Sequence, residues 1–161
     1  MFVVPQLILP SVKFVPHKIL ITYHSMGGNT KELAKIISQS ARDKGIHTFV
    51  SELNEELNIE EFDFVFIGSY TWGNGDLPIR VREYLKWLLK ENEFKLPVFS
   101  VFGTGDTQWT HYCRAVDEIA YHLNKKTKVI SKLKIEQHPV NQVEEISRYV
   151  ATTLKEETFC R

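Results

Sequence analysis

Short apolar runs alternate with longer amphipathic stretches along most of this chain. The runs 19–23, 64–68 and 98–103 are nearly continuously apolar, as expected of central parallel strands that helices cover on both faces. The runs 47–53 and 129–135 interleave polar residues, which is typical of strands at the edge of a sheet. The chain is therefore predicted to be an α/β protein of three layers (α/β/α), with a doubly wound five-stranded parallel sheet in the order 2-1-3-4-5.

Between these runs, apolar residues recur three and four positions apart, which predicts four amphipathic helices that face the sheet. The sets are Leu33, Ile36, Ile37 and Ala41; Val81, Tyr84, Leu85 and Leu88; Val116, Ile119, Ala120 and Leu123; and Val143, Ile146, Val150 and Leu154. The resulting order of elements is βαβ(α)βαβαβα, in which consecutive parallel strands are joined by right-handed crossovers.

The chain of 161 residues fits one domain, which we expect to span residues 18–157. Residues 1–17 are expected to be an N-terminal extension and residues 158–161 a tail. Although apolar, the extension is interrupted by Pro5, Pro10 and Pro16, so it predicts neither a membrane span nor a secretory signal.

Twenty basic and twenty acidic residues cancel, so the chain has no net field that would draw it to nucleic acid or to an anionic membrane. An acidic run between Glu52 and Asp63 is expected to be a solvated loop and helix start. The two cysteines, Cys113 in a predicted helix and Cys160 near the C-terminus, form no zinc-binding pattern and suit a reducing cytosol.

In a sheet of this order, ligands bind beyond the carboxyl ends of the strands, near the first and third. The first strand runs into Ser25-Met26-Gly27-Gly28-Asn29-Thr30, directly before a predicted helix. Its glycines, its hydroxyls and the unpaired amides of a first helical turn predict a phosphate site. The alternative is an ordinary turn with Asn29 as the helix N-cap. Because Asn29 and not a lysine precedes Thr30, ATP or GTP hydrolysis is not expected.

The third strand ends in a loop that contains one large aromatic residue, Trp72, followed by Gly73, Asn74 and Gly75. Trp72 either covers the core or stacks on a planar ligand, and the neighbouring glycines favour stacking. Gly73 and Asn74 both tolerate positive φ, so the peptide between them can turn its carbonyl toward or away from a ligand.

The fourth strand ends in Gly103-Thr104-Gly105-Asp106, and an indole follows at Trp109. A dinucleotide fingerprint would need a third glycine where Gln108 stands, so this loop is a weak signal for NAD. Its backbone amides could instead bond the carbonyls of a flavin ring, or Trp109 could cover the following helix.

At these three loops the sequence resembles the flavodoxins, especially the short-chain flavodoxins of bacilli and related Gram-positive bacteria, over residues 18 to about 156. The resemblance implies a flavodoxin-like fold and a non-covalently bound FMN. It implies that the first loop holds the phosphate, that Trp72 and Trp109 stack on the two ring faces, and that Gly73 to Asn74 is a flipping peptide. The cofactor-binding residues it implies are Ser25, Met26, Gly27, Gly28, Asn29, Thr30, Tyr70, Thr71, Trp72, Gly73, Asn74, Gly75, Gly103, Thr104, Gly105, Asp106, Trp109 and Tyr112.

The resemblance further implies a low-potential one-electron carrier, monomeric and cytoplasmic, rather than an enzyme. Its donor would be a flavodoxin or ferredoxin reductase, and its acceptor an oxygenase, desaturase or reductase. The Gly73 carbonyl would accept a hydrogen bond from the neutral semiquinone. Two features depart from the family: Gly27 stands where a hydroxyl residue is usual, and the chain is neutral rather than acidic.

Two alternatives remain open, an FMN-dependent NAD(P)H or quinone reductase and a flavoprotein activator of manganese ribonucleotide reductase. The two indoles argue against the activator. A phosphoryl-accepting receiver domain of the same topology would need acidic residues where Thr22, Tyr23, Gly68 and Ser69 stand. The six histidines show no ligand spacing, so no metal site is expected.

Overall fold

The computed structural model describes residues 18–91 and 95–155, which form a parallel five-stranded sheet in the order β2-β1-β3-β4-β5. The strands are β1 (Ile19–His24), β2 (Thr48–Glu52), β3 (Phe64–Tyr70), β4 (Val98–Gly105) and β5 (Val129–Glu136). The predicted fold class and strand order are thereby confirmed. The predicted extension 1–17, the tail 158–161 and Cys160 lie outside the described residues.

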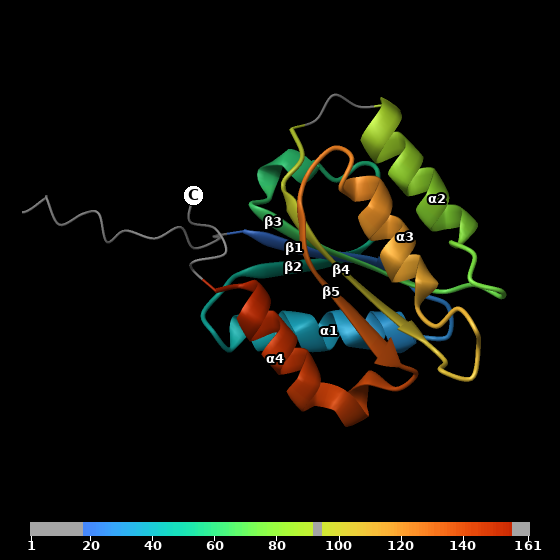
Figure 1. Ribbon diagram of the computed structural model, residues 1–161. Coiled ribbons are helices and arrows are strands. Elements are labelled where there is room, and N and C mark those ends of the chain that lie inside the picture. Colours follow the sequence, from blue (N-terminus) through green and yellow to red (C-terminus); the bar gives the residue numbers. More distant parts are fainter. Residues whose placement is uncertain (1–17, 92–94, 156–161) are drawn as a thin grey trace, which may run out of the picture.

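Helices cover both faces of the sheet (Figure 1). On one face lie α1 (Asn29–Arg42) and α4 (Val143–Thr153). On the other face lie α3 (Arg114–Leu123) and α2 (Ile79–Lys86), which continues into a π-helical turn, η3 (Trp87–Glu91). Short 3₁₀ turns, η2 (Ile59–Glu61) and η4 (Pro139–Gln142), precede β3 and α4.

The core is divided by the sheet into two apolar clusters, because successive side chains of a strand point to opposite faces. Ile19 and Ile21 of β1 join the cluster under α1 and α4, whereas Leu20 between them joins the cluster under α2 and α3. Each of these three residues is at most 1% exposed. The continuous apolar runs of the sequence therefore correspond to strands that are buried on both faces, as predicted.

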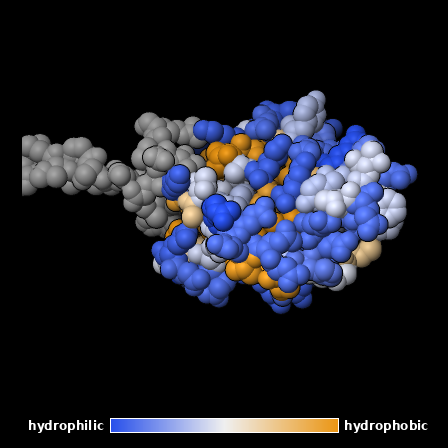
Figure 2. All heavy atoms as spheres, turned by 60° about the horizontal axis from the view of Figure 1, so that its bottom comes forward, coloured by the Kyte–Doolittle hydropathy of each residue, from blue (hydrophilic) through white to orange (hydrophobic). Residues whose placement is uncertain are grey.

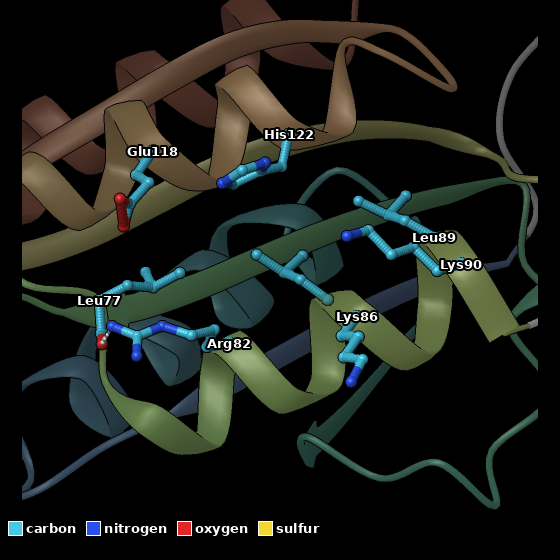
Figure 3. A pocket seen from close by; sticks show the side chains of 8 residues that line it. Leu77, Arg82, Lys86, Leu89, Lys90, Glu118 and His122 are labelled. Carbon is cyan, nitrogen blue, oxygen red and sulfur yellow. Dashed lines mark hydrogen bonds between the residues drawn. The ribbon is translucent and has the colours of Figure 1, made fainter.

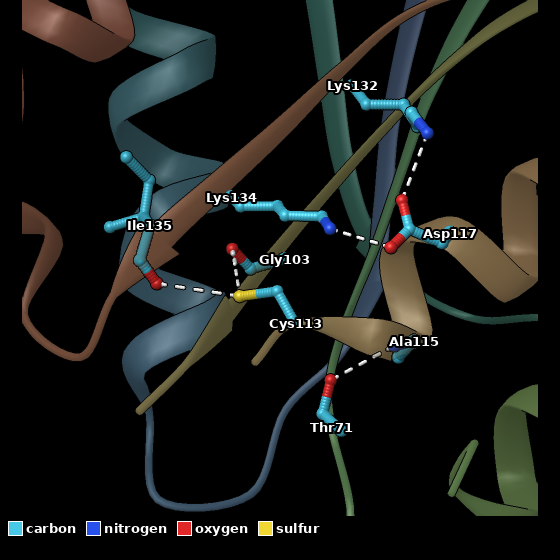
Figure 4. A network of polar contacts seen from close by, with 8 residues as sticks. All are labelled: Thr71, Gly103, Cys113, Ala115, Asp117, Lys132, Lys134 and Ile135. Carbon is cyan, nitrogen blue, oxygen red and sulfur yellow. Dashed lines mark hydrogen bonds and ion pairs between the residues drawn. The ribbon is translucent and has the colours of Figure 1, made fainter. Parts of the chain in front are cut away.

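The edge strands explain the interleaved polar residues. In β5, Leu133 and Ile135 are buried on the α4 side, whereas Lys132 and Lys134 donate to the two carboxylate oxygens of Asp117 in α3 at 3.0 and 2.6 Å (Figure 4). At the opposite edge, β2 leaves Phe49 40% exposed. The alternation in the sequence therefore separates the two faces of β5, whereas in β2 both Phe49 and Val50 are exposed.

Two residues differ from what the helical pattern predicted. Val143, expected to face the sheet, is 46% exposed because α4 only begins there. Cys113 is not in a helix but directly precedes α3, with a left-handed backbone (φ 50°).

The surface that α1 and α4 present is mainly hydrophilic, and its apolar residues form separate patches rather than one continuous area (Figure 2).

Candidate cofactor site

Three loops meet at the carboxyl edge of the sheet. The first-strand loop (25–30) follows β1, the third-strand loop (71–78) follows β3, and the fourth-strand loop (106–113) follows β4. Because β3 pairs with β1 on one side and with β4 on the other, the three loops are neighbours. Tertiary structure thus brings together the three segments that the sequence had identified.

The first-strand loop curls through Gly27 and Gly28, whose φ angles are 85° and 97°. Ser25 Oγ accepts a hydrogen bond from the Lys31 amide at 3.2 Å, and the next amide in the helix bonds the Gly28 carbonyl. In the described chain, the amides of Gly28, Asn29 and Thr30 have no protein acceptor. Gly28, not Asn29, is the N-cap of α1, so the alternative with Asn29 in that position is wrong. These unpaired amides suit an anion.

Thr30 is buried, and its hydroxyl does not point into solvent. Thr30 Oγ1 lies 2.8 Å from Thr104 Oγ1, and the two residues are 1% and 3% exposed. This hydroxyl pair ties the first turn of α1 to the end of β4. Thr30 can therefore contribute its backbone amide to an anion site, while its hydroxyl holds the loop in position.

A hollow of about 380 Å³ lies beside the first-strand loop. Gly27, Gly28 and Asn29 form one wall, and Lys31 and Lys35 bring positive charge, next to a single carboxylate, Glu32. The other wall is the segment after β5, with His138, Pro139 and Val140. This segment is not among the residues predicted from the sequence, although its position after the carboxyl end of a parallel strand was a usable signal.

The third-strand loop contains a tight turn. The amides of Gly75 and Asp76 both bond the Trp72 carbonyl at 2.9 Å, and the Trp72 amide bonds Asp76 in return. Gly73 and Asn74 occupy the central positions of this turn, and Gly73 has a positive φ of 44°. The indole of Trp72 is 50% exposed and belongs to neither core cluster. Its side chain is therefore available to a ligand.

Two contacts hold the third-strand loop against the fourth-strand loop and α3. Thr71 Oγ1 accepts a hydrogen bond from the Ala115 amide at 3.1 Å, in the first turn of α3 (Figure 4). A Cβ added to Gly75 would lie only 2.6 Å from His111 Cβ. Thr71 thus caps a helix here, and Gly75 allows a close approach between the two loops.

The fourth-strand loop is organised by Asp106. One carboxylate oxygen accepts from the Gln108 amide at 2.8 Å, and the other accepts from Gln137 Nε2 at 2.8 Å. Gln137 follows β5 and has a left-handed φ of 45°. Farther along the loop, Trp109 is 64% exposed, so it does not cover the following helix.

Gly103 and Gly105, at the end of β4, leave room for neighbouring side chains. A Cβ on Gly103 would lie 2.5 Å from Val116 Cγ2, and one on Gly105 would lie 2.9 Å from Cys113 Sγ. The Cys113 thiol is 1% exposed and lies 3.8 Å from the Gly103 carbonyl oxygen (Figure 4). Burial raises its pKa to about 11, so it stays a neutral thiol at physiological pH. Burial also raises the pKa of the half-buried Tyr112.

Tyr70 connects the ends of β1 and β3. Its ring lies 5.4 Å from that of His24 and 6.4 Å from that of Trp72, measured between centroids. Burial is the main cause that lowers the pKa of His24, so this histidine is neutral at pH 7. These three rings line a second hollow of about 420 Å³ that reaches the start of α2.

Arg80 fastens the acidic run to α2. Its guanidinium binds Glu55 with two bonds of 2.6 and 2.7 Å and the Leu53 carbonyl at 2.8 Å. The hydrogen bond from Arg80 lowers the pKa of Glu55. This part of the acidic run is therefore anchored rather than simply solvated, and the run leads into a 3₁₀ turn.

Among residues 18–91 and 95–155, no helix is long and apolar enough to cross a bilayer.

Residues 21–149 match the sequence model of the flavodoxin family. The chain is 33% identical over 138 residues to probable flavodoxin 2 of Bacillus subtilis, covering 80% of this chain and 87% of that one. The crystal structure of oxidised flavodoxin 2 from Bacillus cereus superposes with a TM-score of 0.73 at 33% identity, covering 83% of this chain and 94% of the other.

The FMN-bound flavodoxin of Fusobacterium nucleatum shares the fold, with a TM-score of 0.70 at 16% identity, covering 89% of this chain and 99% of the other. The match of the family model over most of the chain, together with the Bacillus relatives, agrees with the geometry of the three loops. This chain therefore belongs to the flavodoxin family, whose members are FMN-binding electron-transfer proteins that interact with redox partners.

Proposed function

We propose that this chain binds one FMN non-covalently across the three loops and carries single electrons between redox proteins at low potential. The observation that carries the proposal is the row of unpaired amides from Gly28 to Thr30, in a first-strand loop whose two neighbouring loops each present an exposed indole. The loops fit the two chemical parts of the cofactor, an anionic ester and a flat apolar ring.

The phosphate end is held by backbone amides and by positive charge. Amides at a helix N-terminus favour an anion, and hydrogen bonds to a charged group contribute about 1.5–3 kcal/mol each. Gly27 supplies no hydroxyl, whereas Lys31 and Lys35 line the same hollow. We infer that these lysines offset part of the phosphate charge. Ser25 and Thr30 then keep the loop in shape through their own hydrogen bonds.

The ring end is held between Trp72 on the inner face and Trp109 on the outer face. Both indoles are at least half exposed, on neighbouring loops, so an aromatic ring has surface to stack on. Backbone groups between Gly103 and Asp106, together with Tyr112, line the pyrimidine edge. Tyr70 and Thr71 hold the third-strand loop in position, Tyr70 through its ring contact with Trp72 and Thr71 through its hydrogen bond from the Ala115 amide.

The bound cofactor supplies one-electron chemistry, and the protein supplies position, electrostatics and exclusion of water. We propose that the turn at Gly73 tunes the reduction potential of the bound FMN. The Gly73 carbonyl would turn toward the ring of the reduced cofactor by rotation of the peptide between Gly73 and Asn74, which is possible because both residues tolerate positive φ.

Gly73→Ala tests this turn. Alanine at a positive φ costs roughly 1 kcal/mol more than glycine, so the balance between the two turn forms shifts. A free-energy difference of about 1 kcal/mol between the two turn forms corresponds to a shift of about 40 mV in a one-electron midpoint potential. We expect the separation between the two one-electron midpoint potentials of the FMN-loaded protein to change by about that amount. A separation within about 10 mV of the wild-type value in a potentiometric titration would refute the switch.

Neutral net charge affects how partners dock. Without a net field, association with a reductase as donor, and with an oxygenase, desaturase or reductase as acceptor, depends on local patches. We propose that the protein acts as a monomer in the cytoplasm and that residues 18–157 form its one domain.

The direct test is cofactor content. The full chain, purified and denatured, should release FMN, and the apoprotein should take up FMN from micromolar solution with a change in its visible spectrum. Riboflavin, which lacks the phosphate, should bind far more weakly. Failure to take up FMN would overturn the proposal. Steady-state oxidation of NAD(P)H with a quinone, without any partner protein, would support the reductase alternative instead.

A further inference from the structure

A groove separates α2 and α3 on their face of the sheet (Figure 3). Its volume is about 460 Å³, which falls in the range of about 300–1,000 Å³ that is usual for small-molecule sites. The groove runs beside α2 from Leu77 to the π-helical turn η3, a type of turn that occurs often at functional sites. Of its lining residues, only Leu77 belongs to the three loops of the cofactor site.

The floor of the groove is apolar. Leu77 and Leu85 are packed into the core beneath it, at 3% and 4% exposure, and Leu89 packs against the same core cluster while remaining half-buried. An apolar group lying on these three leucines would leave water without displacing any polar contact.

The rim carries charges that are not paired with one another. Arg82, Lys86 and Lys90 recur every four residues on the α2 side, and Glu118 and His122 face them from α3 (Figure 3). No ion pair joins these residues within the described chain, and the Arg82 guanidinium donates to the Leu77 carbonyl at 3.3 Å. Apart from His122, three cations stand against one carboxylate.

We propose that this groove binds an amphipathic organic monoanion, a carboxylate, sulfonate or phosphate diester on an apolar chain or ring. The anionic group lies among Arg82, Lys86 and Lys90, and the apolar body lies on the leucine floor. Glu118 on the opposite wall disfavours a second negative charge in the ligand.

The groove also borders the second hollow, because Leu77 and Arg82 line both. That hollow reaches Trp72 in the third-strand loop. A ligand in the groove therefore has one end next to the segment that carries Trp72, and its binding should be detectable there as well as in the groove.

The test is a titration of the full chain, with FMN present in excess, followed by backbone amide NMR. Decanoate probes an apolar chain and 1-naphthalenesulfonate an apolar ring, and saturable shifts at Leu85, Leu89, Glu118 and His122 with either probe support the proposal. 1-Decanol and decylammonium, which share the chain but lack the anion, should bind at least about tenfold more weakly. Equal binding of decanol and decanoate would overturn the proposal. It would also be overturned if neither decanoate nor 1-naphthalenesulfonate caused saturable shifts below about 5 mM.

Variants locate the site. Lys86→Gln with Lys90→Gln should weaken decanoate binding about tenfold. The matched control is Lys126→Gln with Lys128→Gln, two exposed lysines after α3 that do not line the groove and whose loss changes the net charge equally. If the control pair weakens binding as much as the groove pair, the attraction is general electrostatics and the proposal fails.

Discussion

Gly28→Ala should weaken FMN binding by about 100-fold while leaving riboflavin binding unchanged. Gly28 has φ 97°, in the left-handed region, and is the N-cap of α1. Alanine would relax toward negative φ and turn the neighbouring amides away from the phosphate. The loss of two charge-assisted hydrogen bonds of about 1.5 kcal/mol each corresponds to this factor. Titration of the apoprotein with each flavin measures both affinities.

Gly45→Ala is the matched control. Gly45 follows the other end of α1, has φ 80° and, like Gly28, has no heavy atom within 4 Å of an added Cβ. Both substitutions should cost about 1–2 kcal/mol of unfolding free energy through backbone strain alone. Only the Gly28 variant should lose affinity for FMN. An affinity within about twofold of wild type for Gly28→Ala would contradict a phosphate site at this loop.

Gly68→Ala should destabilise the fold by about 3 kcal/mol. Gly68 in β3 pairs with Phe102 in β4, and an added Cβ would lie 2.1 Å from Phe102 Cε2. The Phe102 ring is fully buried, so it has no free space into which it could move. Overpacking of such a core typically costs about 1–3 kcal/mol, and a clash of this depth belongs at the upper end. Urea unfolding of the apoprotein measures the loss.

Phe102→Leu identifies the cause. The smaller side chain removes part of the ring that an alanine at position 68 would meet. In the double variant, the loss of stability should be smaller than the sum of the two single losses by at least about 1 kcal/mol. Additivity within about 0.3 kcal/mol would show that the cost of Gly68→Ala arises elsewhere.

The sequence alone determined the architecture, because the signals for it are local. Continuous apolar runs distinguish buried central strands from half-polar edge strands, and the contrast between Ile19–Tyr23 and the run ending at Ile135 sufficed to order the sheet. Glycines and a lone tryptophan at strand ends likewise marked the three loops. These features depend on residues a few positions apart, so no tertiary information is needed to read them.

The roles of single loop residues were decided only by the tertiary structure. Thr30 pairs with Thr104 across 74 positions of sequence, and Gly105 makes room for Cys113. The segment at His138 joins the first-strand loop although more than a hundred residues separate them. No local pattern encodes such contacts, because they arise only when the twisted sheet brings the ends of distant strands together. The sequence could thus predict which loops form the site, whereas packing between the loops decides which hydroxyls and glycines face a ligand and which support the fold.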